Sequence, residues 1–152
     1  NNNVQKFDKN GNFIMKFGTY GSGDGEFLNP TDVAIDSLGN ILVVDSFNDR
    51  VQKFDKNGNF IMKFGKSGSG DGEFASPLEL AIDSSGNILV VDTKNNRVQV
   101  FNSDGIYISQ FGNQGSISER LQDPVGIAID SDGNVYVPDG RDADVHVFSP
   151  IK

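Results

Sequence analysis

The stretch VQKFDKNGNFIMKFG occupies residues 4–18 and recurs, letter for letter, at residues 51–65. The offset between the two copies is 47 residues, and it continues through the chain. A period of this length is typical of stacked or radial repeat folds. The repeat, which is out of phase with the start of the sequence, therefore organises the whole chain. The same offset relates residues that recur once in each period: Val51, Val98 and Val145; Pro30, Pro77 and Pro124; Asp45, Asp92 and Asp139.

Each period contains four short segments with the character of β-strands. In the first complete period they are residues 31–36, 41–45, 51–54 and 60–65, which we letter a, b, c and d. β-Branched and aromatic residues dominate them, and no useful length has helical spacing. The connections a–b and c–d, such as DSLGN and DKNGN, carry Asp or Asn before Gly, which favours hairpin turns. The sequence therefore predicts an all-β fold of antiparallel strands.

Four antiparallel strands per period predict the blade of a β-propeller. The composite pattern from Pro30 to Gly65, which begins again at Pro77, closely resembles the NHL repeat, and the resemblance covers essentially the whole chain. The third period departs from it, since Pro138 replaces the second Val of VVD and the arginine is displaced to Arg141. The resemblance implies a non-enzymatic domain that binds a protein, peptide or glycan. RNA binding, known for some NHL domains, is a weaker alternative.

The strand order predicts assembly. The chain reads cd, abcd, abcd, abc, and a closed ring of three blades would need more rotation per blade than propellers of ~4–8 blades show. We expect a homodimer with six blades, because two-fold assemblies are the commonest oligomers. Its repeat units are residues 30–76, 77–123 and 124–152, the last completed by residues 1–29 of the partner chain, whose segment 13–18 supplies strand d. An excised piece of a longer propeller, or an engineered duplication, is the alternative.

Composition limits the functions. The net charge of −8, from 21 acidic and 13 basic residues, argues against a general binder of nucleic acid. No apolar run approaches the ~18–20 residues of a membrane helix, so we expect a soluble protein. The chain has no cysteine, and this leaves its compartment open, an extracytoplasmic one included.

Alternating strands place the b–c loops and the d–a linkers at one end of the blades, and we expect any ligand to bind there. The exposed contacts would include Tyr20 and Asn95. Two arginines follow a b-strand aspartate by five positions, so an ion pair within the loop is the first expectation and ligand contact the second. Two acidic residues that begin strand a would face the channel, where they bind a cation or basic peptide or are merely hydrated. The candidate ligand-binding residues are Asp32, Phe47, Arg50, Glu79, Lys94, Asn96, Arg97 and Arg141.

No catalytic residue, metal site or cofactor is predicted. His146 is the single histidine, which disfavours the alternative of a metal-dependent lyase or hydrolase at the channel mouth. DSDGN at 130–134 is similar to the start of a calcium loop, but hairpin chemistry explains it better. We also expect three alanines of the innermost strands to be buried where blades converge: Ala34, Ala81 and Ala128.

Overall fold

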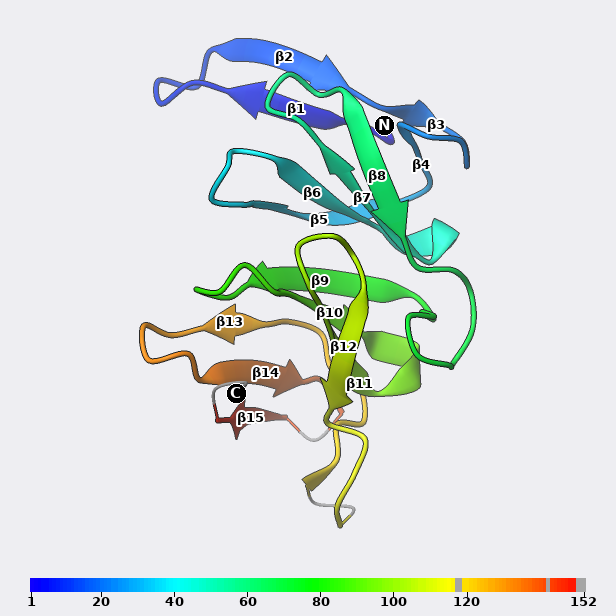
Figure 1. Cartoon of the computed structure of the whole chain (residues 1–152), viewed down its shortest axis with the longest axis vertical. Coiled ribbons are helices and arrows are strands. Elements are labelled where there is room, and N and C mark those ends of the chain that lie inside the picture. The colour runs from blue at the N-terminus through cyan, green and yellow to red at the C-terminus, as the bar shows by residue number, and fades with distance from the viewer. Residues whose placement is uncertain (117–118, 142, 150–152) are drawn as a thin grey trace.

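The computed structural model describes residues 1–116, 119–141 and 143–149. Four antiparallel sheets follow one another along the long axis of the molecule (Figure 1). The N-terminal hairpin contains β1 (Val4–Phe7) and β2 (Phe13–Phe17). The first blade contains β5 (Pro30–Ile35), β6 (Ile41–Asp45), β7 (Arg50–Phe54) and β8 (Phe60–Phe64); the second contains β9 (Pro77–Ile82), β10 (Ile88–Asp92), β11 (Arg97–Phe101) and β12 (Tyr107–Phe111); the C-terminal sheet contains β13 (Ala128–Ile129), β14 (Val135–Asp139) and β15 (Asp144–Phe148).

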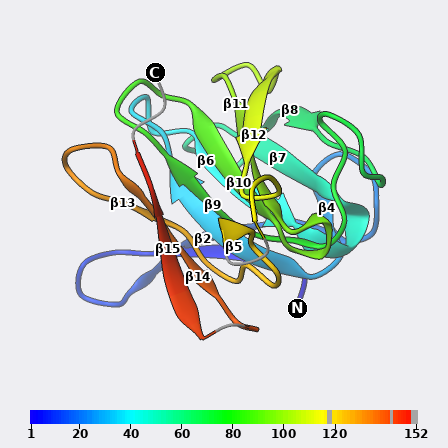
Figure 2. The same cartoon turned by 90° about the horizontal axis from the view of Figure 1, so that it is seen from below.

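The order cd, abcd, abcd, abc is confirmed by the strand pairings. Short elements complete the connections: a parallel pair, β3 (Thr19–Tyr20) with β4 (Glu26–Phe27), and the 3-10 turns η1 (Ser46–Asn48) and η2 (Thr93–Asn95) in the b–c loops. In the view along the stack, the C-terminal sheet and the N-terminal hairpin cross rather than run parallel (Figure 2). Such rotation between successive sheets is the arrangement of propeller blades.

The turns explain why the hairpins form where the sequence predicts them. The Asp36 carboxylate accepts hydrogen bonds from the backbone N–H groups of Leu38 and Asn40, both at 2.9 Å, and from the Asn40 side chain. Gly39 adopts φ +82°, which glycine supplies without strain. The same bonds recur at Asp83 and Asp130. The DxxGN motif is therefore a turn that satisfies its own carboxylate.

The apolar core lies between the sheets rather than within any of them. Between the first and second blades, Leu42, Val44 and Val51 pack against Leu80 and its neighbours. Similar clusters join the N-terminal hairpin to the first blade and the second blade to the C-terminal sheet. A single sheet cannot bury its faces alone, so each blade depends on the next. Phenylalanines repeat in these layers, with ring centroids 4.8 Å apart for Phe17 and Phe54, 4.7 Å for Phe64 and Phe101, and 4.6 Å for Phe111 and Phe148.

The prediction of buried inner alanines is wrong. Ala34 and Ala81 are half-buried, and Ala128 is exposed. The inner contact between the two complete blades is instead filled by the larger Leu80, which is 5% exposed and touches the cluster that Ala34 borders. Ala128 lies in the last sheet of the stack, and no further sheet among the described residues packs on it. No helix among the described residues is both long and apolar enough to cross a membrane.

Candidate functional site

The b–c loops and the d–a linkers meet at one end of the blades, as predicted. In the first blade, the Phe47 N–H donates to the Leu28 carbonyl at 3.0 Å, and the Asn48 side chain donates to Gly21 O at 2.9 Å. The second blade repeats these contacts, through the Lys94 N–H and the Asn95 side chain. Loop and linker therefore form one continuous surface on each blade, which we call the loop face.

A buried polar network supports the loop face. The Asp45 carboxylate is fully buried and accepts hydrogen bonds from Arg50 Nε at 2.8 Å and from the Leu28 N–H at 2.7 Å. The remaining guanidinium nitrogens of Arg50 donate to the linker carbonyls of Ser22, Gly23 and Glu26. This confirms the predicted ion pair within the loop. Arg97 makes the equivalent pair with Asp92 at 2.8 Å.

These contacts show that the two arginines support the linker and do not reach a ligand in solvent. Arg50 is 6% exposed and Arg97 is 3% exposed, so their guanidinium groups are directed at the linker rather than at solvent. Gln52 assists, since its amide accepts the Gly25 N–H and donates to the Glu26 carbonyl. The arrangement holds the glycine-rich linker in a fixed shape. It keeps the exposed residues of the same face in place.

Four of the predicted contacts are exposed on the loop face. Phe47 has 63% of its surface exposed, and Tyr20, in the linker beside it, has 72%. Lys94 occupies the position of Phe47 plus 47 residues, and it is exposed in η2. Arg141, in the third b–c loop, is also exposed. Exposed aromatic and cationic side chains on a rigid surface are common anchors for protein partners.

The acidic residues that begin strand a connect neighbouring sheets. Asp32 Oδ2 accepts the Leu80 N–H at 2.9 Å, and Glu79 Oε2 accepts the Ile127 N–H at 3.1 Å. Thr31 adds a bond of 2.6 Å from its hydroxyl to the Leu78 carbonyl. The two carboxylates thus fix the spacing of adjacent inner strands. This structural use was not among the roles predicted for them.

Asn96 also acts between sheets. With its side-chain amide in the orientation that satisfies its neighbours, it donates to the carbonyls of Thr93 and Gln122. Asp49, one period earlier, accepts the Ser76 N–H at 2.8 Å. Both residues have positive φ, 54° and 49°, which Asn and Asp tolerate better than most residues. The end of each b–c loop therefore reaches the linker of the following sheet.

The third repeat departs from this pattern at strand c. Asp144 stands where the other blades have arginine, and it lies directly opposite the buried Asp139 in the strand register. His146 stands where the others have glutamine, and its Nε2 is buried without a hydrogen-bond partner among the described residues. Like charges in opposed positions and an unsatisfied buried nitrogen both weaken a strand pair.

At the opposite end of the blades, the hairpin turns carry aspartates whose carboxylates are hydrogen-bonded within their own turns. Hydrogen bonds from the Asn12 side chain and backbone lower the pKa of Asp8, and equivalent bonds from Asn59 lower that of Asp55. Burial alone would raise the pKa of Asp36, but bonds from Asn40 and the ammonium of Lys53, 3.1 Å away, lower it below its ordinary value. Within the described ranges, no three His, Cys, Asp or Glu side chains gather as metal ligands would.

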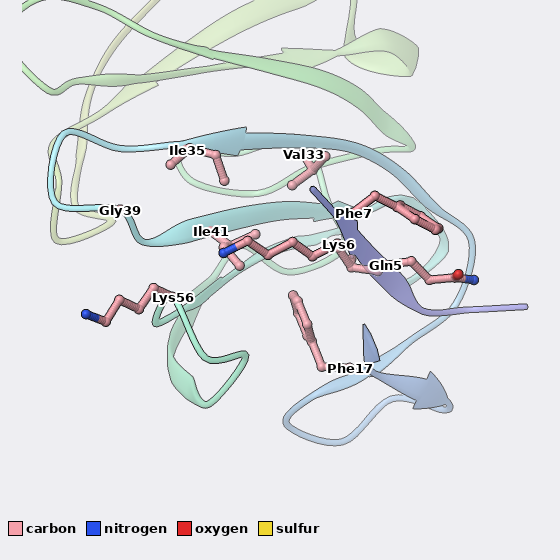
Figure 3. A pocket seen from close by; sticks show the side chains of 10 residues that line it. Gln5, Lys6, Phe7, Phe17, Val33, Ile35, Gly39, Ile41 and Lys56 are labelled. Carbon is pink, nitrogen blue, oxygen red and sulfur yellow. The ribbon is translucent and has the colours of Figure 1, made fainter. Parts of the chain in front are cut away.

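A pocket of about 550 Å³ lies between β1 and β5 (Figure 3). Val33 and Ile35 form one wall of it, and they are 47% and 59% exposed. Strand β1 forms the other wall. The charged side chains among its lining residues are Lys6 and Lys56, so the pocket is apolar with a cationic rim. Sequence analysis did not predict it, although Val33 occupies the position of the buried Leu80.

With this geometry, the chain is a β-propeller segment, and comparisons place it more closely. The profile of a family described as a 6-bladed beta-propeller matches residues 1–53 and 37–93. The chain belongs to this family. A comparison with curated protein sequences gives no match.

Solved structures share the fold. A protein of unknown function from Bacteroides caccae superposes with a TM-score of 0.69 at 15% identity, over 97% of this chain and 55% of that one. A streptogramin B lyase gives 0.69 at 15%, over 99% and 49%. A catalytically inactive histidine-to-alanine variant of virginiamycin B lyase from Staphylococcus aureus, with quinupristin, gives 0.66 at 13%, over 97% and 48%. The chain thus spans about half the length of these structures, and identities this low establish the fold alone.

Proposed function

We propose that this protein is a non-enzymatic interaction module of the NHL-repeat type, which binds a protein or peptide ligand on its loop face. The observation that supports the proposal is that Phe47 and Tyr20 are exposed on a face whose loop and linker are held in place by a buried polar network. Arg50 and Asp45, bonded to each other, hold the linker by four hydrogen bonds to its backbone. A preformed surface loses little entropy on binding, so a few exposed anchors suffice for recognition.

The chemistry of the anchors suggests the ligand. Phe47 and Tyr20 offer apolar contact area, while Lys94 and Arg141 add positive charge on the neighbouring loops. We infer a ligand with an apolar side chain flanked by acidic groups, which is a common composition for a peptide segment. Lyase or hydrolase activity and RNA binding remain alternatives from the sequence, and no contact within the described residues favours either of them.

The full binding surface requires a closed ring. Three blades leave apolar sheet faces exposed at both ends of the stack, such as Val33 on one and Val145, 59% exposed, on the other. We propose that two copies close a six-bladed ring, in keeping with the family to which the chain belongs. The loop faces of both copies then lie on the same side of the ring.

Selection from a displayed random-peptide library on the immobilised protein tests the proposal. We expect enriched peptides with acidic and apolar residues whose binding weakens at least about tenfold in Phe47→Ser and Lys94→Ser. The matched controls lie at the opposite end of the blades: Leu38→Ser, which removes a side chain 82% exposed in an a–b turn, and Lys56→Ser. Peptides that tolerate both loop-face changes but lose binding in Leu38→Ser would place the site at the wrong end and refute the proposal.

A further inference from the structure

The pocket between β1 and β5 occupies a position that the other sheets fill with an inner hairpin. In the first blade, β5 and β6 lie beside strand c and cover the start of the next blade, where Ala34 and Leu42 pack around Leu80. The N-terminal hairpin supplies only strands c and d, so nothing described covers the equivalent Val33. Leu80 is 5% exposed, whereas Val33 is 47% exposed.

We propose that this pocket receives the β13–β14 hairpin of a second copy of this chain, with Lys6 paired to Asp130 of that copy. The inference rests on the proposed two-copy ring and names the strands that close it. The C-terminal sheet presents the required apolar residues on its outer side, since Ala128 and Tyr136 are exposed there. They occupy the positions of Ala34 and Leu42 in the first blade.

Charge complementarity supports this occupant. In the first blade, Lys53 of strand c lies 3.1 Å from Asp36 of the a–b turn. Lys6 occupies the position of Lys53, and the hairpin β1–β2 has no a–b turn of its own to pair with it. The incoming turn carries Asp130 and the exposed Asp132. In its own sheet Val147 stands at the lysine position, and Asp130 accepts a hydrogen bond from the Tyr136 hydroxyl at 3.1 Å. Lys6 of another copy would give this turn the cation that Lys53 gives to Asp36.

Strand β15 is poorly matched to the sheet in which it lies. Two of its positions differ from both β7 and β11: Asp144 replaces arginine opposite Asp139, and His146 replaces glutamine. A third, Val147, replaces the lysine of β7 but matches Val100 of β11. The first two place a like charge and an unsatisfied buried nitrogen in the strand pair. The strand therefore pairs with β14 less favourably than β7 pairs with β6.

Strand β1 removes the like charge and restores the glutamine, and it also carries the lysine of β7. Asn3, Gln5 and Lys6 stand at the positions of Asp144, His146 and Val147. Phe7 stands at the position of Phe148, whose ring lies 4.6 Å from Phe111, and Phe7 is itself 51% exposed. In the ring, β1 and β2 therefore replace β15 beside β14 of the second copy and supply strand d as well. Each closing blade reads β13, β14, β1, β2, and β15 lies outside it.

A charge exchange tests the pairing in the full chain. Size exclusion with light scattering compares the measured molar mass with the monomer mass of 16.4 kDa. Over a dilution series, this comparison gives the dimer dissociation constant. We expect Lys6→Glu to raise that constant about tenfold. Asp130→Lys should raise it further, because this change also removes the hydrogen bonds of the turn, and the double variant should dimerise more tightly than Asp130→Lys alone. Lys94→Glu makes the same charge change on the loop face and should leave the constant unchanged.

A second variant improves the displaced strand and so does not depend on damage to the fold. The triple variant Asp144→Arg/His146→Gln/Val147→Lys gives β15 the residues of β7. We expect this variant to remain folded, with undiminished resistance to urea, and to dimerise at least about tenfold more weakly than the wild type. Hydrogen exchange should show the amides of β15 unprotected in the wild-type dimer and protected in this variant. If the dimer dissociation constant changes neither in the charge-exchange variants nor in the triple variant, the assigned strands are wrong but the ring is not. A wild-type monomer at all concentrations overturns both.

Discussion

Replacement of Arg97 by methionine isolates the energetic role of the buried network. The pair of Arg97 with Asp92 is almost wholly removed from water, with side chains 4% and 0% exposed. Loss of one partner of such a pair costs about 3–5 kcal/mol, because the remaining charge stays buried. Asp92 keeps bonds from the Ala75 N–H, Asn95 and Gln99. We therefore expect the lower end of this range, about 3 kcal/mol.

Urea unfolding followed by far-ultraviolet circular dichroism, at one fixed protein concentration, measures the change in the free energy of unfolding. The control is Lys63→Met, which removes a pair with Asp24 of 2.6 Å whose side chains are 46% and 53% exposed. Exposed pairs contribute only about 0–1 kcal/mol. Addition of Asp92→Asn to Arg97→Met should restore part of the loss by removing the buried charge. Equal, small losses in Arg97→Met and Lys63→Met would refute the reasoning.

Two further outcomes follow from the turns and linkers. Gly65→Ala should lower the free energy of unfolding by about 1–3 kcal/mol, since a Cβ there would lie 2.5 Å from the Phe74 ring. The control is Gly39→Ala, which has a similar φ and nothing within 4 Å of the added Cβ, so it measures the backbone strain alone. An equal loss of stability in both variants would contradict the contact with Phe74. Because the folded-state pKa values of Asp8, Asp36, Asp55 and Asp130 are lowered from 3.8, the stability they contribute is complete above about pH 4 and is lost as the pH falls through the lowered values. Urea titrations at pH 6 and pH 3 measure this loss, and Asp36→Asn should reduce the difference between them; an unchanged difference would count against it.

The repeat made most of the fold predictable. Strand type, order and turn positions follow from a pattern that occurs up to three times, so each occurrence supports the others. The loop-face placement of Phe47 and the Asp45–Arg50 pair were also predictable, because both depend on spacing along adjacent antiparallel strands.

Contacts between sheets were not predictable in the same way. The bond of Asp32 to the Leu80 N–H joins residues 48 apart in sequence, and it depends on how far one sheet is rotated against the next. The burial of the inner alanines was misjudged for the same reason. The mismatched residues of β15 were visible as departures in the third repeat, but their consequence required the register that places Asp144 opposite Asp139.

The two identical segments, residues 4–18 and 51–65, have a consequence for how the chain recognises itself. Val51 is fully buried and Lys53 is 9% exposed, while Val4 is only half-buried and Lys6 is exposed. Since the side chains are the same, the difference arises entirely from what each copy adjoins. Strand β6 cannot distinguish one copy from the other by complementarity. The covalent connection determines which copy pairs with β6, because it holds residues 51–65 at a local concentration of the order of millimolar beside their own blade. Specificity at this position is therefore a property of tether length rather than of side-chain chemistry.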